Sequence, residues 1–198
     1  MNSSVYPEEG QEYQQVINSV KKKYSGKKPL RVEFEVEIYW KIRERTQEKR
    51  GTFYLNPGDR FRVETGKSVY VCDGQTFWQY NKESNQVIIK NLLDVSLSMH
   101  PSQQLSDYLQ LDYDIQKRDG DKIVLNWKGN PDDIKEQYNT IRIVIDKDDA
   151  EVTEMYLLDK NGNKTTYRFK KTESGINIDK SKFKFEIPEG VDVFDSRD

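Results

Sequence analysis

Residues able to act as nucleophiles or bases are few in this chain. His100 is the only histidine, Cys72 is the only cysteine, and Ser98 and Ser102 flank the histidine. A nucleophilic site built from these residues also requires an acid that orients the imidazole, and no such set stands at a recognisable spacing. Because Pro101 follows His100 directly, we interpret the histidine as part of a helix break. The sequence therefore predicts no catalytic residues and a protein that is not an enzyme.

Two acidic clusters resemble metal-binding loops only in composition. Residues 146–149 read DKDD and residues 131–133 read PDD. Neither has the spacing of an EF-hand, so turns explain both. One histidine and one cysteine do not make a zinc site. Cys72 cannot form an internal disulfide, and we expect it to be a small buried thiol. The sequence predicts neither a metal nor any other cofactor.

Composition narrows the remaining functions. The 198 residues are 34% hydrophobic and 33% charged, with a formal net charge of −2 and a mean hydropathy of −0.94. This charge argues against nucleic-acid binding, and no apolar run is long enough for a membrane span. The lysines at 21–23 and 27–28 either neutralise a helix C-terminus or touch anionic headgroups. We expect a single domain, residues 1–198, built on a sheet with one charged face.

The first element that the sequence predicts is a helix. Tyr13, Val16, Ile17, Val20 and Tyr24 form one stripe at helical spacing, with glutamates before it and lysines after it, and they predict an N-terminal lid helix over residues 8–25. Residues 31–43 then alternate strictly between an apolar and a mainly charged set of side chains. This alternation predicts a long strand with one apolar face and one face in water.

A run of short strands follows. Turn signals at residues 56–59, 66, 73–74 and 81–85 divide the following stretch into short strands, as in an antiparallel meander. The long strand and this meander together span residues 30–90. Leucine-rich residues 91–110, broken at Pro101, predict the central lid helices. Residues 111–198 predict five more strands and a tail. The expected fold is mainly β (α+β): a curled antiparallel sheet of about eleven strands that forms an incomplete barrel, covered by a lid of about three α-helices.

One face of this sheet is rich in large apolar side chains. The residues alone leave two possibilities open, a completely filled interior or a cavity that admits a lipid. For a cavity that admits a lipid, the predicted wall residues are Val32, Phe34, Val36, Ile38, Trp40, Phe53, Leu55, Phe61, Val63, Val69, Val71 and Trp78. The predicted lid residues are Val16, Val20, Leu92, Leu93, Leu97, Met99, Leu105 and Leu109.

The meander and the tail carry a family resemblance. Residues 51–62 read GTFYLNPGDRFR and residues 69–81 read VYVCDGQTFWQYN, while the tail has FKF at 183–185 and PEGVDV at 188–193. In order and separation, these segments resemble the LolA-like periplasmic carriers of outer-membrane lipoproteins, and the resemblance covers most of the chain. It implies an incomplete barrel capped by helices, with the acyl chains of the cargo entering between them.

From this resemblance we expect a soluble periplasmic chaperone that carries lipoprotein acyl chains from the inner to the outer membrane. The implied partners are acylated lipoproteins, an inner-membrane lipoprotein-releasing transporter and an outer-membrane acceptor, and the carrier itself is expected to be a monomer. Residues 1–4 contain no apolar leader, so we interpret Met1 as a start residue added after removal of a signal peptide. Asn56 departs from the family pattern, because proteobacterial carriers have there an arginine that ties the sheet to the lid.

Other functions fit parts of the same pattern. A lipid- or partner-sensing regulatory binding domain would have the same fold and would recognise its ligand without transporting it. A lipid-modifying enzyme would need an acid–base or nucleophile set that the sequence lacks. The membrane-anchored acceptor of lipoproteins would need an N-terminal lipidated cysteine, and residues 1–10 contain none. Bound acyl lipid in the purified protein would separate a carrier from a domain with a filled core.

Overall fold

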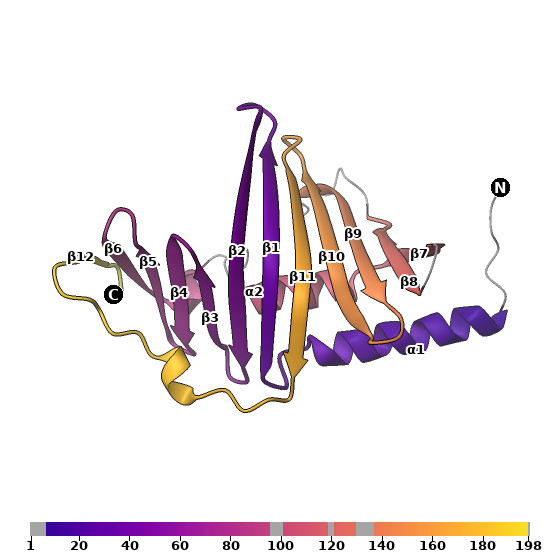
Figure 1. The fold of residues 1–198 in the computed structure, drawn as a ribbon, viewed down its shortest axis with the longest axis horizontal. Coiled ribbons are helices and arrows are strands. Elements are labelled where there is room, and N and C mark those ends of the chain that lie inside the picture. Colours follow the sequence, from indigo (N-terminus) through magenta and orange to yellow (C-terminus); the bar gives the residue numbers. More distant parts are fainter. Residues whose placement is uncertain (1–6, 96–100, 119–120, 130–136, 198) are drawn as a thin grey trace.

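The computed structural model describes residues 7–95, 101–118, 121–129 and 137–197 (Figure 1). Its strands are β1 Leu30–Trp40, β2 Arg45–Asn56, β3 Arg60–Thr65, β4 Ser68–Asp73, β5 Thr76–Asn81, β6 Gln86–Asn91, β7 Tyr113–Arg118, β8 Lys122–Trp127, β9 Tyr138–Asp146, β10 Glu151–Asp159, β11 Lys164–Ser174 and β12 Asp192–Asp195. In the described residues these twelve strands form one sheet, in the order β12-β6-β5-β4-β3-β2-β1-β11-β10-β9-β8-β7. All neighbours are antiparallel except β12, which runs parallel to β6.

This sheet corrects the predicted number of strands, and it is an open sheet where an incomplete barrel was expected. The prediction of about eleven strands omitted β12, because a four-residue strand with only exposed side chains leaves no alternation to detect. The sheet is open rather than closed into a barrel, since β12 and β7 lie at its opposite ends (Figure 1). The mainly β character and the order of the elements are as the sequence indicated.

The helices are fewer than expected. The described residues contain two α-helices, α1 Pro7–Lys23 and α2 Pro101–Gln110, and the short 3-10 turns η1 Leu92–Asp94 and η3 Lys180–Phe183. The prediction of about three α-helices was wrong, because the described part of the segment before Pro101 forms only a single 3-10 turn. Pro101 begins α2, a position at which its missing N–H costs no hydrogen bond.

The central strand β1 ends earlier than its alternation indicated. Residues 41–44 form a turn in which Glu44 has a φ of 46°, so the strand stops at Trp40 instead of residue 43. Ile42 consequently leaves the apolar face and is 89% exposed. Elsewhere β1 is hydrogen-bonded along its length to β2 on one side and to β11 on the other.

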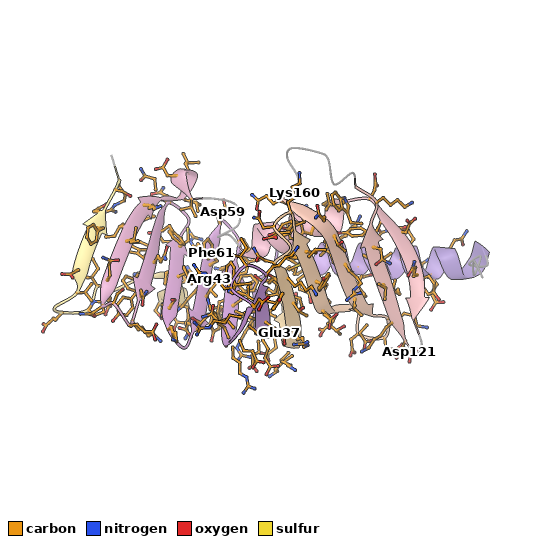
Figure 2. All side chains as sticks on the ribbon, turned by 90° about the horizontal axis from the view of Figure 1, so that it is seen from above. Glu37, Arg43, Asp59, Phe61, Asp121 and Lys160 are labelled. Carbon is orange, nitrogen blue, oxygen red and sulfur yellow. The ribbon has the colours of Figure 1, made fainter. Side chains whose placement is uncertain are left out.

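The two faces of the sheet have different covers. We call inner face the one covered by α1 and α2; it includes Val32, Phe53 and Ile143, which belong to one buried core with Val20 of α1 and Leu109 of α2. The opposite, outer face carries the charged residues of β1. In Figure 2, Glu37 lies on the side of the central strands that faces away from α2. The tail after β11 crosses the outer face on its way to β12 (Figure 1).

Candidate functional site

The centre of the inner face is an apolar wall made by β1 and its two neighbours. Phe34 and Val36 both point to this side, because alternate residues of a strand share a face. The strand register sets Phe34 opposite Gly51 of β2, and it sets Val36 between Lys49 of β2 and Tyr167 of β11. The apolar side chains of β1 on this face therefore have Gly51 and Lys49 of β2 as neighbours.

A cavity of about 190 Å³ lies between this wall and α2. Its lining is apolar with the exception of one lysine. The lining residues are Val32, Phe34, Val36, Ile38, Lys49, Phe53, Val63, Leu105, Met155, Tyr167 and Phe169. The interior is therefore not completely filled by the side chains of the protein itself.

Aromatic rings form the β11 side of the cavity. The ring of Tyr167 lies 6.4 Å from that of Phe34 and 6.3 Å from that of Phe169, the latter pair nearly parallel at 7°. Burial raises the pKa of the Tyr167 hydroxyl to about 12, with the neighbouring Tyr138 as a second cause. At neutral pH this side of the cavity is uncharged and suited to hydrocarbon.

Helix α2 covers one side of the cavity. Leu105 lines it, and Leu109 is fully buried in the core next to it. Tyr108 packs edge-on against Tyr138 with 5.9 Å between the ring centres, and its backbone oxygen accepts a hydrogen bond from the Tyr113 hydroxyl. A ten-residue helix with two buried leucines is a small cover for a long sheet.

The predicted wall residues divide between the two faces. Those that line the cavity are Val32, Phe34, Val36, Ile38, Phe53 and Val63. Leu55 and Phe61 are buried in the core on the same face, and Trp40 lies at the end of β1 with 38% of its surface exposed. Val69, Val71 and Trp78 lie on the outer face, because Val71 pairs with Trp78 while the alternate pair, Cys72 and Phe77, enters the inner core.

The tail explains why the outer face of β4 and β5 is also apolar. Phe185 places its ring 6.3 Å from that of Trp78 and 6.0 Å from that of Tyr80. Phe183 beside it is 2% exposed. Residues 69, 71 and 78 thus pack near the tail on the opposite side of the sheet from the cavity, contrary to the face that the sequence analysis assigned to them.

The predicted lid residues divide in the same way. Val20, Leu105 and Leu109 are buried, and Val16 and Leu92 are partly buried against the core. Leu93 is 97% exposed and does not cover the cavity. Leu97 and Met99 lie outside the described residues, as does His100.

Several lining residues were not predicted as part of the site. Met155, Tyr167 and Phe169 come from β10 and β11, and their alternation was visible, but the prediction concentrated on the meander. Lys49 was missed because a lysine in a charged stretch, residues 48–50, gives no sign of facing an apolar cavity. Alternate residues of β2 share a face, so Lys49 lies on the same inner face as Phe53, four residues later. This alternation was the signal by which Lys49 could have been found.

No arginine takes the place of the family's link between sheet and lid at Asn56 in the described structure. Arg60, opposite Asn56 in β3, donates hydrogen bonds to the backbone oxygens of Asp73 and Pro57. Arg62 pairs with Glu64 on the outer face. These contacts of Arg60 and Arg62 lie within the sheet and its turns.

Neither a metal-binding cluster nor a reactive thiol is found among the described residues. Among them, no group of three or more His, Cys, Asp or Glu side chains is placed to hold a metal ion. Burial raises the pKa of the Cys72 thiol to about 11, so it remains protonated and unreactive at neutral pH. In the same part of the chain, no helix has the length and apolar character needed to cross a membrane.

Comparisons with known proteins give matches over most of the chain. The family model described as outer membrane lipoprotein carrier protein LolA matches residues 25–186. The outer-membrane lipoprotein carrier protein of Chromohalobacter salexigens is 30% identical over 159 residues, which cover 76% of this chain and 72% of that protein. Its counterpart in Alkalilimnicola ehrlichii is 28% identical over 156 residues, or 76% and 70% of the two chains.

A solved structure shares the fold. The crystal structure of an uncharacterized conserved protein from Thermus thermophilus superposes with a TM-score of 0.56 at 18% identity, covering 92% of this chain and 99% of that one. At this identity the likeness concerns the arrangement of the elements alone.

Proposed function

Because this chain belongs to the LolA family of outer-membrane lipoprotein carriers, we propose that it shields lipoprotein acyl chains in the cavity of its inner face and shuttles them from the inner to the outer membrane. In this proposal the protein is a periplasmic chaperone and not an enzyme. It receives its cargo from an inner-membrane lipoprotein-releasing transporter and delivers it to an outer-membrane acceptor.

The observation that supports this proposal is the partly empty, apolar space under α2. Transfer of each acyl methylene out of water is worth ~0.8 kcal/mol, so lipoprotein chains require cover in an aqueous compartment. Val32, Phe34, Val36, Ile38, Phe53 and Val63 are the residues to which we assign this cover, with Trp40 at the exposed end of their strand. An acceptor with a similar cavity would take the chains at little net cost.

The size of the cavity supports the idea of a cover that moves. At about 190 Å³ it is smaller than the roughly 300–1,000 Å³ of common ligand pockets, and a lipoprotein carries two or three chains. We therefore propose that α2 separates from the sheet when cargo enters. Leu105 and Leu109 are the contacts that this movement breaks.

Capture of a lipidated test protein, compared with its unacylated form, tests the proposal. We expect the protein to hold the lipidated form in solution and not to retain the unacylated form. Phe34→Asp should abolish capture, since it places a charge in the cavity wall. Tyr54→Asp is the matched control, because Tyr54 lies on the outer face of the neighbouring strand, and it should leave capture unchanged.

A second variant is a control for loss of capture that is caused only by unfolding of Phe34→Asp. Val36→Phe fills the cavity without adding charge, and we expect it to reduce capture while circular dichroism reports a folded sheet. Equal retention of both forms of the test protein, or full capture by folded Phe34→Asp and Val36→Phe variants, would contradict the assigned cavity.

A further inference from the structure

The apolar cavity is adjoined by a second, polar hollow. β3 pairs with β2 only from Gly51 to Asn56, so in the described chain residues 45–50 of β2 have no strand partner on that side. A hollow of about 620 Å³ lies there. It is lined by Gln47, Glu48, Lys49, Arg50, Thr65, Gly66, Lys67, Ser68, Tyr70, Asn81 and Glu83. Its lining is polar and charged, in contrast to that of the cavity.

Among the described residues, Lys49 alone lines both spaces. Its side chain shares the inner face with Val36, its partner across the strands, and is half-buried. A lysine in this position can lay its methylene stem along apolar surface while its ammonium group reaches the polar side. Lys49 therefore marks the boundary between a hydrocarbon-like and a water-like compartment.

The charge of Lys49 is not matched within the described structure. The other two cations of the hollow have carboxylate partners: Lys67 lies 2.6 Å from Glu83, and Arg50 lies 3.0 Å from Glu35. No carboxylate of the described residues forms an ion pair with Lys49. An unmatched cation at the mouth of an apolar cavity favours a ligand that brings a negative charge to that point.

We propose that this site binds anionic amphiphiles, with the hydrocarbon chain in the cavity and the carboxylate or phosphate head against the Lys49 ammonium in the polar hollow. This inference rests on the proposed function and adds a preference for the charge of the head group. The cavity has room for part of one chain without rearrangement: a cavity of about 150 Å³ in an apolar core is large enough for benzene, and this one has about 190 Å³. Such a ligand needs less movement of α2 than a lipoprotein.

Calorimetric titration with four probes tests the head-group preference. Dodecanoate and dodecyl phosphate carry the chain and a charge, dodecanol carries the chain alone, and inorganic phosphate carries the charge alone. We expect the two anionic amphiphiles to bind most tightly and phosphate alone not to bind. Lys49→Met should weaken dodecanoate binding about ten-fold, the effect of losing a contact to a charged group at a half-exposed site, and should change dodecanol binding less than two-fold.

Two further variants complete the test. Lys49→Arg keeps the charge and should keep dodecanoate binding. Lys171→Met is the matched control, since Lys171 lies on the outer face beside Glu173, and it should change nothing. Equal weakening of dodecanoate and dodecanol by Lys49→Met, or no weakening of either, would overturn the head-group site and leave the acyl cavity in place. Failure of the unmodified protein to bind dodecanoate, dodecyl phosphate and dodecanol would overturn the cavity as well.

Discussion

Gly51 shows how the absence of one side chain shapes the cavity. It lies opposite Phe34 on the inner face. A β-carbon added at Gly51 would come within 2.5 Å of the backbone oxygen of Glu64 and 2.8 Å of Cζ of Phe34. Because Gly51 has no side chain, the Phe34 ring can lie close to β2. The ring is there placed between the polar residues 45–50 of β2 and the cavity.

We expect Gly51→Ala to destabilise the fold by about 1–3 kcal/mol, the usual cost of overpacking a tight site. The contact with a backbone oxygen cannot be relieved by a side-chain rotation, so the strands must shift. Urea unfolding of the variant and of the unmodified protein measures this loss. Gly66→Ala is the control, because no atom lies within 4 Å of the corresponding β-carbon, and its stability should stay within about 0.5 kcal/mol. Equal midpoints for both variants would show that the Phe34 ring is not confined by Gly51.

At the scale of elements, β1 and α2 are held by contacts of different strength. β1 is hydrogen-bonded to strands on both sides and lies in the middle of the sheet. The contacts of α2 include the burial of Leu105 and Leu109 and the packing of Tyr108 on Tyr138. Because opening a short helix exposes less surface than unpairing a central strand, we expect the lid and the wall of the same cavity to belong to different cooperative units.

Hydrogen exchange should therefore distinguish the two elements. We expect the amides of residues 105–110 in α2 to exchange through local opening, well before those of β1, because opening α2 exposes only a few side chains. Leu109→Ala removes a fully buried leucine and should accelerate exchange in α2 while leaving β1 unchanged. Mass spectrometry of peptides from the two elements reads both rates. Equal protection of α2 and β1 would mean that the lid opens only with global unfolding and would argue against its movement during loading.

The same contrast explains which elements the sequence predicts. β1 was evident because one parity is apolar and the other mainly charged, so its register could be chosen. β4 reads SVYVCD, in which Val69 and Val71 are as apolar as Tyr70 and Cys72. Alternation cannot select a face there, and the wrong parity was assigned to the cavity. The information that decides the face is Phe185 of the tail, more than 100 residues away.

At the scale of the whole molecule, one open sheet separates two environments. Its inner face is covered by two helices and contains the cavity, and the outer face of β4 and β5 is covered by the tail. The rest of the outer face carries ion pairs, such as Arg31 with Glu173 at 2.6 Å and Lys170 with Glu35 at 3.0 Å. This division accounts for a mean hydropathy of −0.94 in a protein with a large apolar core.

Family and sheet content were accessible from motifs and turns, whereas the size of the cavity was not. The volume under α2 depends on how Phe34, Tyr167 and Leu105 pack against each other, and side-chain packing from three distant segments leaves no trace in local periodicity. The edge strand β12 was also hidden, because it is defined by its pairing with β6 and not by its own residues.

The charges of the whole molecule predict a stability that falls at both ends of the pH scale. The pKa of Glu35 is lowered, first by its hydrogen bond to Lys170, and that of Asp195 is lowered to about 2, first by Arg197. A lowered folded-state pKa gives stability that is present above the unfolded value and lost as the pH falls through the folded one. The melting temperature should therefore decline below a pH of about 4.

The buried tyrosines set the alkaline limit. Burial raises the pKa of Tyr24 and of Tyr167 to about 12. Their stabilising effect is complete below the unfolded pKa of about 10 and is lost as the pH rises toward the folded value, because the unfolded chain releases these protons first. Thermal unfolding followed by circular dichroism from pH 3 to 11 measures both limits. Tyr167→Phe should reduce the decline above pH 10 and leave the acid limit unchanged. An equally steep alkaline decline in this variant would mean that Tyr167 is solvated in the folded protein, and the cavity it lines would then contain water rather than a dry space for hydrocarbon.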